Sequence, residues 1–447
     1  MLHPEPTADV ASSPSRFVVG TYRVRVEALS ERGEAHGRVV TPLEPAATAD
    51  LARVYHTSAE RAPDPEEFTF IGALPGEIVD VEARWSLPRD GRRPSRRIPP
   101  PSVRVIGVVA PAAERVGAPC QVFGVCGGCQ FQHLAYPAQL AWKTERVRAA
   151  LASAGLGDVT VDAAIGCAEP WGYRNHMRFS VNREGRAGLT ARGSHRVLEL
   201  DRCPIAHPAV NEALAAVRDV TLPRPQLVAR AGDATGQIML QPTPPASVLE
   251  RLTMAGLEVR ESEMEERLLG TPFRIRPSSF FQTNTAQANR MAEIVLSLLP
   301  AGPDVTLVDA YCGVGVFAAL MASRAGRVIA IEESASAIRD AQWNLRAFAN
   351  VEIVKAKVED ALPTINTRVD GLVIDPPRAG CQRSVLDTLI AYRAPRVVYV
   401  SCNPDTLARD LALLCRATGA YRVARVQPLD MFPQTAHIET IVALEAV

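Results

Sequence analysis

Two side chains that can do chemistry follow two apolar segments near the C-terminus. Cys402 lies one residue beyond the apolar run 397–400, after Ser401, and Asp375 directly follows the apolar run 371–374. Parallel strands end at one edge of a sheet, so we expect the thiol and the carboxylate to lie close together. A thiolate adds readily to electrophilic carbon, and the pair therefore predicts covalent catalysis by Cys402.

Four other cysteines have a spacing that suits a metal. Cys120, Cys126 and Cys129 form a C-x5-C-x2-C group on a Gly-containing loop, and Cys203 follows far downstream. Four thiolates can hold either a [4Fe-4S] cluster or a structural zinc, and spacing alone does not choose between them. The remaining cysteines lack such spacing and are predicted to be buried structural thiols: Cys167, Cys312, Cys381 and Cys415.

A glycine turn upstream of Asp375 predicts a nucleoside cofactor. The apolar run 306–310 leads into Gly313 and Gly315, and a second apolar run ends at Glu332. Glycines let the backbone approach a cofactor closely, and an acid about 20 residues further on can accept hydrogen bonds from ribose hydroxyls. The Asp-Pro-Pro-Arg sequence at 375–378 argues against a dehydrogenase.

Length and composition indicate the number of domains and the class of protein. A chain of 447 residues exceeds what one hydrophobic core organises, so two or three domains are expected. Hydrophobic residues make up 47% and charged residues 22%, as in soluble globular enzymes. The sequence shows no secretory signal and no apolar run of about 18 residues, so a cytoplasmic protein without membrane contact is predicted.

The order of apolar and polar segments predicts four regions. Residues 17–85 alternate as in a small antiparallel barrel, interrupted by an acidic insertion at 42–67, and residues 86–104 form an Arg- and Pro-rich linker. Residues 105–270 have mixed helix and strand patterns. Residues 271–447 alternate strands with helices, which predicts an α/β fold with a doubly wound parallel sheet.

Three segments have the composition of nucleic-acid contacts. The barrel is a candidate RNA-binding module, the arginines at 84–104 can follow a phosphate backbone, and the stretch 171–179 combines arginines with aromatic rings that stack on unpaired bases. Each pattern also fits a structural alternative: a purely structural barrel, a solvated linker and an ordinary amphipathic strand.

Five motifs together carry a family resemblance. They are Phe-Phe-Gln-Thr-Asn at 280–284, Asp-Ala-Tyr-Cys-Gly-Val-Gly at 309–315, Asp-Pro-Pro-Arg-Ala-Gly at 375–380, Ser-Cys-Asn-Pro at 401–404 and Asp-Met-Phe-Pro-Gln-Thr-Ala-His-Ile-Glu at 430–439. With them the chain resembles the RNA uracil-5-methyltransferases, and among these the iron-sulfur members that modify 23S ribosomal RNA. The resemblance implies an N-terminal TRAM barrel, a central iron-sulfur domain and a Rossmann-like methyltransferase domain.

The resemblance also implies cofactors and roles for single residues. It implies S-adenosylmethionine as methyl donor, an RNA partner without an obligate protein partner, and a [4Fe-4S] cluster rather than zinc at Cys120, Cys126, Cys129 and Cys203. The implied cofactor contacts are Gln282, Tyr311, Glu332 and Asp375. Cys402 is the implied nucleophile and Glu439 the implied base. Val316 and Lys357 depart from the family pattern, which often has asparagine at both positions.

Three alternative functions stay open at this stage. The RNA could be transfer RNA instead of ribosomal RNA. An amino-directed methyltransferase also uses Asp-Pro-Pro motifs, but it would not need Cys402. A non-enzymatic, cluster-bearing RNA-binding protein would not bind S-adenosylmethionine.

Overall fold

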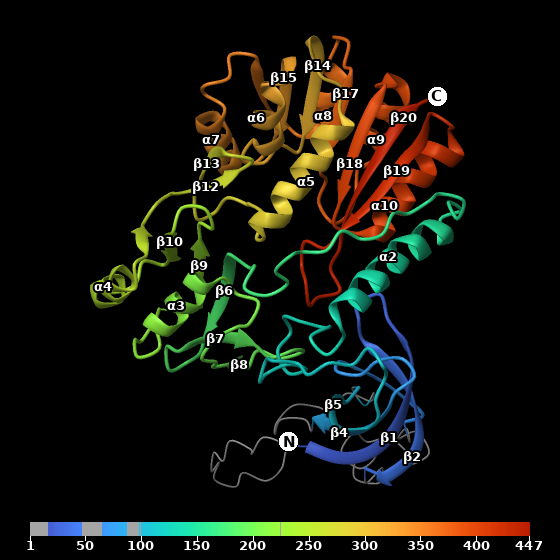
Figure 1. The fold of residues 1–447 in the computed structure, drawn as a ribbon, viewed down its shortest axis with the longest axis vertical. Coiled ribbons are helices and arrows are strands. Elements are labelled where there is room, and N and C mark those ends of the chain that lie inside the picture. The colour runs from blue at the N-terminus through green and yellow to red at the C-terminus, as the bar shows by residue number, and fades with distance from the viewer. Residues whose placement is uncertain (1–16, 47–64, 87–97, 99, 224) are drawn as a thin grey trace. The chain divides into compact units, whose positions relative to one another are not determined.

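The computed structural model describes residues 17–46, 65–86, 98, 100–223 and 225–447 (Figure 1). Most of the predicted acidic insertion and most of the predicted Arg- and Pro-rich linker lie outside these residues. The chain divides into two compact units, one of residues 1–118 and 123–125 and the other of residues 119–122 and 126–447. Each unit has its own sheets, and the two are described separately.

The first unit is a five-stranded antiparallel sheet in the order β3-β2-β1-β4-β5. Its strands are β1 (Phe17–Leu29), β2 (Ala35–Glu44), β3 (Glu67–Phe70), β4 (Ile78–Ser86) and β5 (Ser102–Ala110). Alternate residues such as Tyr22, Val24 and Val26 point into one core, because successive side chains on a strand point to opposite faces. The antiparallel strands agree with the predicted alternation, and β5 extends the sheet beyond the predicted range 17–85.

The second unit begins with a long helix and a second sheet. Helix α2 (Tyr136–Ser153) precedes a six-stranded sheet in the order β11-β10-β9-β6-β7-β8. The elements around it are β6 (His176–Val181), β7 (Ala187–Thr190), β8 (Val197–Leu198), α3 (Pro208–Ala216), β9 (Gln226–Ala231), β10 (Gln237–Gln241), α4 (Ala246–Met254) and β11 (Glu258–Arg260). A hairpin of β12 (Met264–Leu268) and β13 (Thr271–Ile275) follows.

The C-terminal part of this unit is a seven-stranded sheet in the order β16-β15-β14-β17-β18-β20-β19. Five strands are parallel, and β20 runs antiparallel between β18 and β19. The strands are β14 (Gly302–Ala310), β15 (Ala325–Glu332), β16 (Val351–Lys355), β17 (Gly371–Ile374), β18 (Arg396–Ser401), β19 (Tyr421–Leu429) and β20 (Glu439–Ala446). The helices are α5 (Thr285–Leu298), α6 (Val316–Ala322), α7 (Ala335–Asn344), α8 (Val358–Ala361), α9 (Arg383–Tyr392) and α10 (Pro404–Leu411).

Both faces of this sheet are buried by helices. On β14, Val308 packs in a core with residues of α9 and α10, whereas the next residue toward the N-terminus, Leu307, packs in a second core with residues of α5 and α6. A strand covered on both faces reads as a continuous apolar run, which is the pattern that the sequence shows. No helix in the described part of the chain is both long and apolar enough to cross a membrane.

Candidate active site

The seven-stranded sheet brings five of the predicted site residues to one edge. Tyr311 follows β14, Glu332 ends β15, Asp375 follows β17 and Cys402 follows β18. Glu439 begins β20, which runs the opposite way, so its first residue reaches the same edge. The carboxyl edge is where open α/β sheets bind ligands, and the arrangement is therefore a candidate active site.

Cys402 and Glu439 lie on neighbouring strands. Ser401 pairs with Thr440 in the antiparallel ladder of β18 and β20. This pairing places Cys402, which follows Ser401, beside Glu439, which precedes Thr440. Burial and, to a smaller extent, the charge of Glu439 raise the pKa of the half-buried Cys402 thiol to about 11, while Arg378 opposes them. In the free enzyme the thiol is therefore protonated at neutral pH and needs activation.

Two carboxyl groups, that of the buried Glu439 and that of the partly buried Asp375, share this edge. Burial raises the pKa of Glu439 well above its ordinary value, and Asp375 adds to the effect while Arg378 opposes it. Burial alone raises the pKa of Asp375 to about 7. A carboxyl group whose pKa is raised is a stronger base once ionised, which suits a proton acceptor at position 439.

Arg378 and His437 are site residues that sequence reasoning did not single out. Arg378 Nη2 lies 3.4 Å from His437 Nδ1, and the backbone oxygen of Arg378 accepts a hydrogen bond from Asn403 Nδ2 at 3.1 Å. Burial, followed by Arg378, lowers the pKa of His437 to about 4, so the ring is neutral at neutral pH. Both residues stand inside the quoted family motifs, which was the signal that could have identified them.

The glycine turn has the features of a cofactor cradle. Gly313 has a φ of 57°, and a Cβ at this position would meet no atom within 4 Å. Its backbone N–H donates to Glu332 Oε2 at 3.0 Å, so the turn is tied to the acid that ends β15. Tyr311 is held at a φ of 67°, a conformation that costs free energy in a non-glycine residue and often occurs at functional sites.

Asp309 is a further buried acid that the sequence reasoning did not assign. Its Oδ2 accepts a hydrogen bond from the backbone N–H of Ala318 at 2.8 Å, whereas its buried Oδ1 has no partner in the described part of the chain. Burial raises the pKa of Asp309 to about 7. An unpaired buried oxygen beside the glycine turn fits a site that is completed by a polar ligand.

Gln282 lies on a loop that is anchored to a neighbouring helix. The loop joins β13 to α5, and Ser279 in it donates a hydrogen bond to the buried Asp340 of α7 at 2.6 Å. Phe280 is 72% exposed. Of the two departures from the family pattern, Val316 is the first residue of α6 and Lys357 precedes the first residue of α8.

The four cysteines predicted to bind a metal lie near one another. Burial, together with smaller contributions from Cys203, Cys126 and Cys120, raises the pKa of Cys129 to about 12. Nevertheless, in the part of the chain that the structure describes, no group of three or more His, Cys, Asp or Glu side chains is arranged to hold a metal ion. The predicted iron-sulfur cluster therefore stays a prediction.

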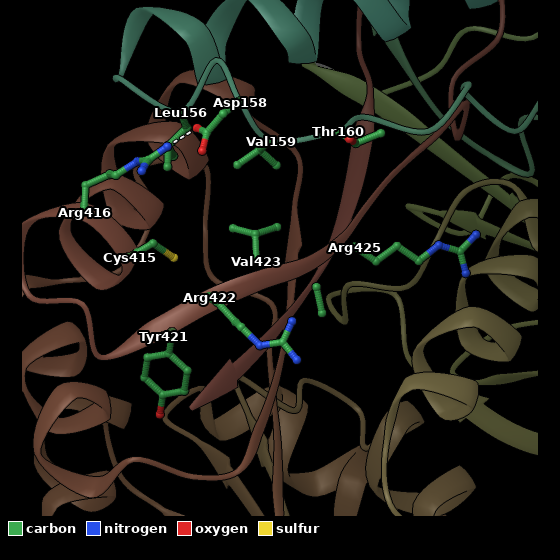
Figure 2. A pocket seen from close by; sticks show the side chains of 11 residues that line it. Leu156, Asp158, Val159, Thr160, Cys415, Arg416, Tyr421, Arg422, Val423 and Arg425 are labelled. Atoms are coloured by element: carbon green, nitrogen blue, oxygen red, sulfur yellow. Dashed lines mark hydrogen bonds and ion pairs between the residues drawn. The ribbon is translucent and has the colours of Figure 1, made fainter. Parts of the chain in front are cut away.

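Two cavities of the second unit lie away from the strand ends. One, of about 750 Å³, is lined by Cys120, Trp171 and several arginines. The other, of about 380 Å³, lies between β19 and residues 156–160 (Figure 2). The three arginines that line the second cavity are paired, Arg416 with Asp158, Arg422 with Glu445 and Arg425 with Asp162. Because the carboxylates neutralise them, we assign this cavity no role.

Known proteins are similar to this chain in sequence and in fold. A family model described as tRNA (uracil-5-)-methyltransferase matches residues 257–447. An uncharacterized RNA methyltransferase of Thermosynechococcus vestitus is 35% identical over 390 residues, covering 76% of this chain and 87% of that protein. Another from Halalkalibacterium halodurans is 35% identical over 398 residues, covering 76% of this chain and 86% of that protein.

The fold, the residues at the sheet edge and these relatives together define an RNA methyltransferase. Within this class, the chain belongs to the RNA uracil-5-methyltransferase family. Family membership supports the predicted cofactor S-adenosylmethionine.

A solved structure has the same fold over nearly the whole length. It is Pyrococcus abyssi tRNA (uracil-54, C5)-methyltransferase in complex with S-adenosyl-L-homocysteine, which matches with a TM-score of 0.67 and 22% identity. The match covers 95% of this chain and 99% of that chain. It confirms the predicted mixed α/β methyltransferase fold, while the TRAM and iron-sulfur assignments stay predictions.

Proposed function

We propose that this enzyme methylates carbon 5 of a uridine in structured RNA through a covalent adduct with Cys402. The favoured substrate is 23S ribosomal RNA. The observation that carries the proposal is the pairing of Ser401 with Thr440, which sets Cys402 and Glu439 side by side at the carboxyl edge of the sheet.

Cys402 starts the proposed reaction. Carbon 5 of uracil is a weak nucleophile, but addition of a thiolate at carbon 6 gives an enolate whose electron density lies on carbon 5. The bond that forms joins Cys402 Sγ to carbon 6. Arg378 supports this step because its positive charge lowers the pKa of the thiol.

The cofactor would be held by the residues around the glycine turn. S-adenosylmethionine, when bound, would supply the electrophilic methyl group that carbon 5 attacks, and cleavage of its S–CH3 bond would release S-adenosylhomocysteine. Gln282, Tyr311, Glu332 and Asp375 are the proposed contacts, and the open space at Gly313 and the unpaired Oδ1 of Asp309 support a ligand there.

Glu439 completes the proposed cycle. After methyl transfer, carbon 5 carries both a methyl group and a hydrogen. The Glu439 carboxylate accepts that proton, the electrons of the C–H bond re-form the C5–C6 double bond, and the Cys402 thiolate leaves. The target uridine must be swung out of its RNA stack before any of these steps.

The larger cavity supports contact with RNA. Trp171, Arg186 and Arg202 line it, and aromatic rings together with guanidinium groups stack on unpaired bases. The Pyrococcus abyssi neighbour acts on transfer RNA, which makes transfer RNA the second candidate substrate. Mapping 5-methyluridine in the ribosomal and transfer RNA of a deletion strain separates the two: the substrate is the RNA that loses a modified position.

We also propose that Cys120, Cys126, Cys129 and Cys203 hold a [4Fe-4S] cluster. The proximity of the four thiols supports this, and metal binding that reorganises the loop would reconcile it with the absence of a preformed site among the described residues. Anaerobically purified protein should contain iron and absorb broadly in the visible range, and Cys203→Ala should lose both. Bound zinc or a metal-free protein would refute the cluster.

The test of the proposed reaction is methylation by Cys402→Ala and Cys402→Ser. Both variants should bind S-adenosylmethionine in calorimetry but transfer no methyl group to RNA, because neither can form the adduct. Full activity of Cys402→Ala would instead favour methylation of an exocyclic amine.

A further inference from the structure

The loop that leads to Glu439 is held by hydrogen bonds at every one of five successive carbonyls. This β19–β20 loop, residues 430–438, joins β19 to β20. The donors are Gln287 Nε2 to the oxygen of Asp430 at 2.8 Å, Asn284 Nδ2 to Met431 at 3.2 Å, Lys143 Nζ to Phe432 at 3.1 Å, Tyr173 Oη to Pro433 at 3.0 Å, and the backbone N–H of Gln130 and Phe131 to Gln434 at 3.0 and 2.9 Å.

Gln139 on helix α2 forms a reciprocal pair with Gln434 of this loop. Gln139 Nε2 donates to Gln434 Oε1 at 3.0 Å, and Gln139 Oε1 accepts from the backbone N–H of Gln434 at 3.0 Å. Both side chains are buried, so neither bond competes with water. A pair that satisfies both partners inside a protein fixes their relative position more firmly than one bond at the surface.

Lys143 is a second anchor from the same helix face. It lies four residues after Gln139, so both side chains point the same way. Lys143 Nζ donates to Asp430 Oδ1 at 2.5 Å as well as to the backbone of Phe432. Gln139 and Lys143 therefore hydrogen-bond to the loop both at its start and near its middle.

The backbone conformation of Gln434 shows the effect of these hydrogen bonds on the loop. Gln434 has a φ of 70°, a left-handed backbone conformation that is unfavourable for a non-glycine residue. Such a conformation persists only where the surroundings over-determine it. At Gln434 these surroundings are Gln139, Gln130 and Phe131, and the last two directly follow Cys129.

We propose that Gln139, with Lys143 as second anchor, is a positioning residue that aims the Glu439 carboxylate at the proton on carbon 5. The inference rests on the roles proposed above for Cys402 and Glu439. Neither Gln139 nor Lys143 touches the reacting atoms. They act through the β19–β20 loop, in which four residues, 435–438, separate Gln434 from Glu439.

Cys402 is positioned by different contacts. Asn403 Nδ2 donates to the backbone oxygen of Arg378 at 3.1 Å, and Ser401 Oγ donates to the backbone oxygen of Asn403 at 3.1 Å. Loosening the β19–β20 loop should therefore leave attack by Cys402 and methyl transfer intact. It should slow only removal of the carbon 5 proton, so the methylated adduct, with its Sγ–C6 bond unbroken, should accumulate.

The test uses Gln139→Met, which keeps the side-chain length but removes both bonds to Gln434, together with the bonds from Gln139 Nε2 to the backbone oxygens of Phe131 and Leu134. Gln434→Ala removes one of the two bonds and is the milder variant should Gln139→Met not fold. Arg148→Met is the matched control, because Arg148 also lies on α2 but its side chain is half exposed and forms an ion pair with Glu145 of the same helix. The RNA is an unmodified transcript that the wild-type enzyme methylates.

We expect turnover of Gln139→Met to fall about 10- to 100-fold, as for a displaced general base, with KM for RNA nearly unchanged. A denaturation-resistant enzyme–RNA band carrying labelled methyl should accumulate on natural uridine, while the rate of adduct formation with 5-fluorouridine RNA stays at the wild-type level. Equal losses in turnover and 5-fluorouridine adduct formation, without the methylated band, would overturn the positioning role. Failure of the wild-type enzyme to form the 5-fluorouridine adduct would instead refute the proposed function.

Discussion

Lys143 Nζ lies 2.5 Å from Asp430 Oδ1, and neither side chain is exposed to solvent. Tyr136 Oη donates to the other carboxylate oxygen of Asp430 at 2.9 Å, so the pair is part of a buried network. Removing one partner of a buried ion pair leaves an uncompensated charge in the protein interior. The pair therefore joins helix α2 to the β19–β20 loop in a way that a single substitution breaks.

We expect Lys143→Met to lower the free energy of unfolding by about 3–5 kcal/mol, because Asp430 is left buried without its cation. The double variant Lys143→Met/Asp430→Asn should recover at least part of this loss, since the uncompensated charge is gone. Denaturant unfolding of the two variants and the wild type measures both effects. A loss below about 1 kcal/mol for Lys143→Met would show that the pair does not stabilise the loop.

Adduct formation should accelerate with pH. Because burial raises the pKa of Cys402 to about 11, only a small fraction of the thiol is ionised at neutral pH. The single-turnover rate of adduct formation with 5-fluorouridine RNA should rise about tenfold per pH unit in the range below that pKa. A rate that is independent of pH would mean that the thiol is already ionised or that another step limits the reaction.

Arg378→Gln should slow the attack of Cys402. The arginine lowers the pKa of the thiol, so its removal should reduce the thiolate fraction and slow adduct formation by about tenfold or more. Arg378→Lys keeps the charge and should lose less, which distinguishes the electrostatic effect from lost packing. The variants are compared by single-turnover rates with 5-fluorouridine RNA, and identical rates for Gln and wild type would contradict the assigned effect.

Asp309→Asn should change how stability depends on pH. The pKa of Asp309 is raised by burial from 3.8 to about 7, so its contribution to stability is present below its ordinary pKa and is lost as the pH rises to about 7. In the cofactor-free enzyme this loss should amount to about 2–4 kcal/mol. Asparagine can still accept from the backbone N–H of Ala318 but does not ionise. Thermal unfolding from acid to neutral pH should therefore show a smaller decline for the variant, and parallel curves would contradict the prediction.

The sequence was sufficient to predict the parallel part of the large sheet and the edge at which Tyr311, Glu332, Asp375 and Cys402 gather. Each of these residues follows or ends an apolar run, and parallel strands deliver their carboxyl ends to one edge. Local patterns alone did not predict the place of Glu439. It depends on β20 inserting antiparallel between β18 and β19, and only the family motif at 430–439 pointed to a role for it.

Other parts of the site depend on contacts that no local pattern encodes. Lys143 and Asp430 are 287 positions apart, and a lysine at helical spacing is ordinarily a solvated residue. The unpaired oxygen of Asp309 likewise follows from packing, because its sequence context is that of any strand end. Such groups are found only when the distances between remote segments are known.

The most direct test of the account is to locate the covalent bond in the complex of the wild-type enzyme with 5-fluorouridine RNA. With fluorine in place of hydrogen, carbon 5 has no proton for a base to remove, so the adduct should stall after methyl transfer. Mass spectrometry of the digested complex should find the modified nucleotide attached through Sγ of Cys402. Attachment to another side chain, or methyl transfer without any attachment, would contradict the proposed mechanism.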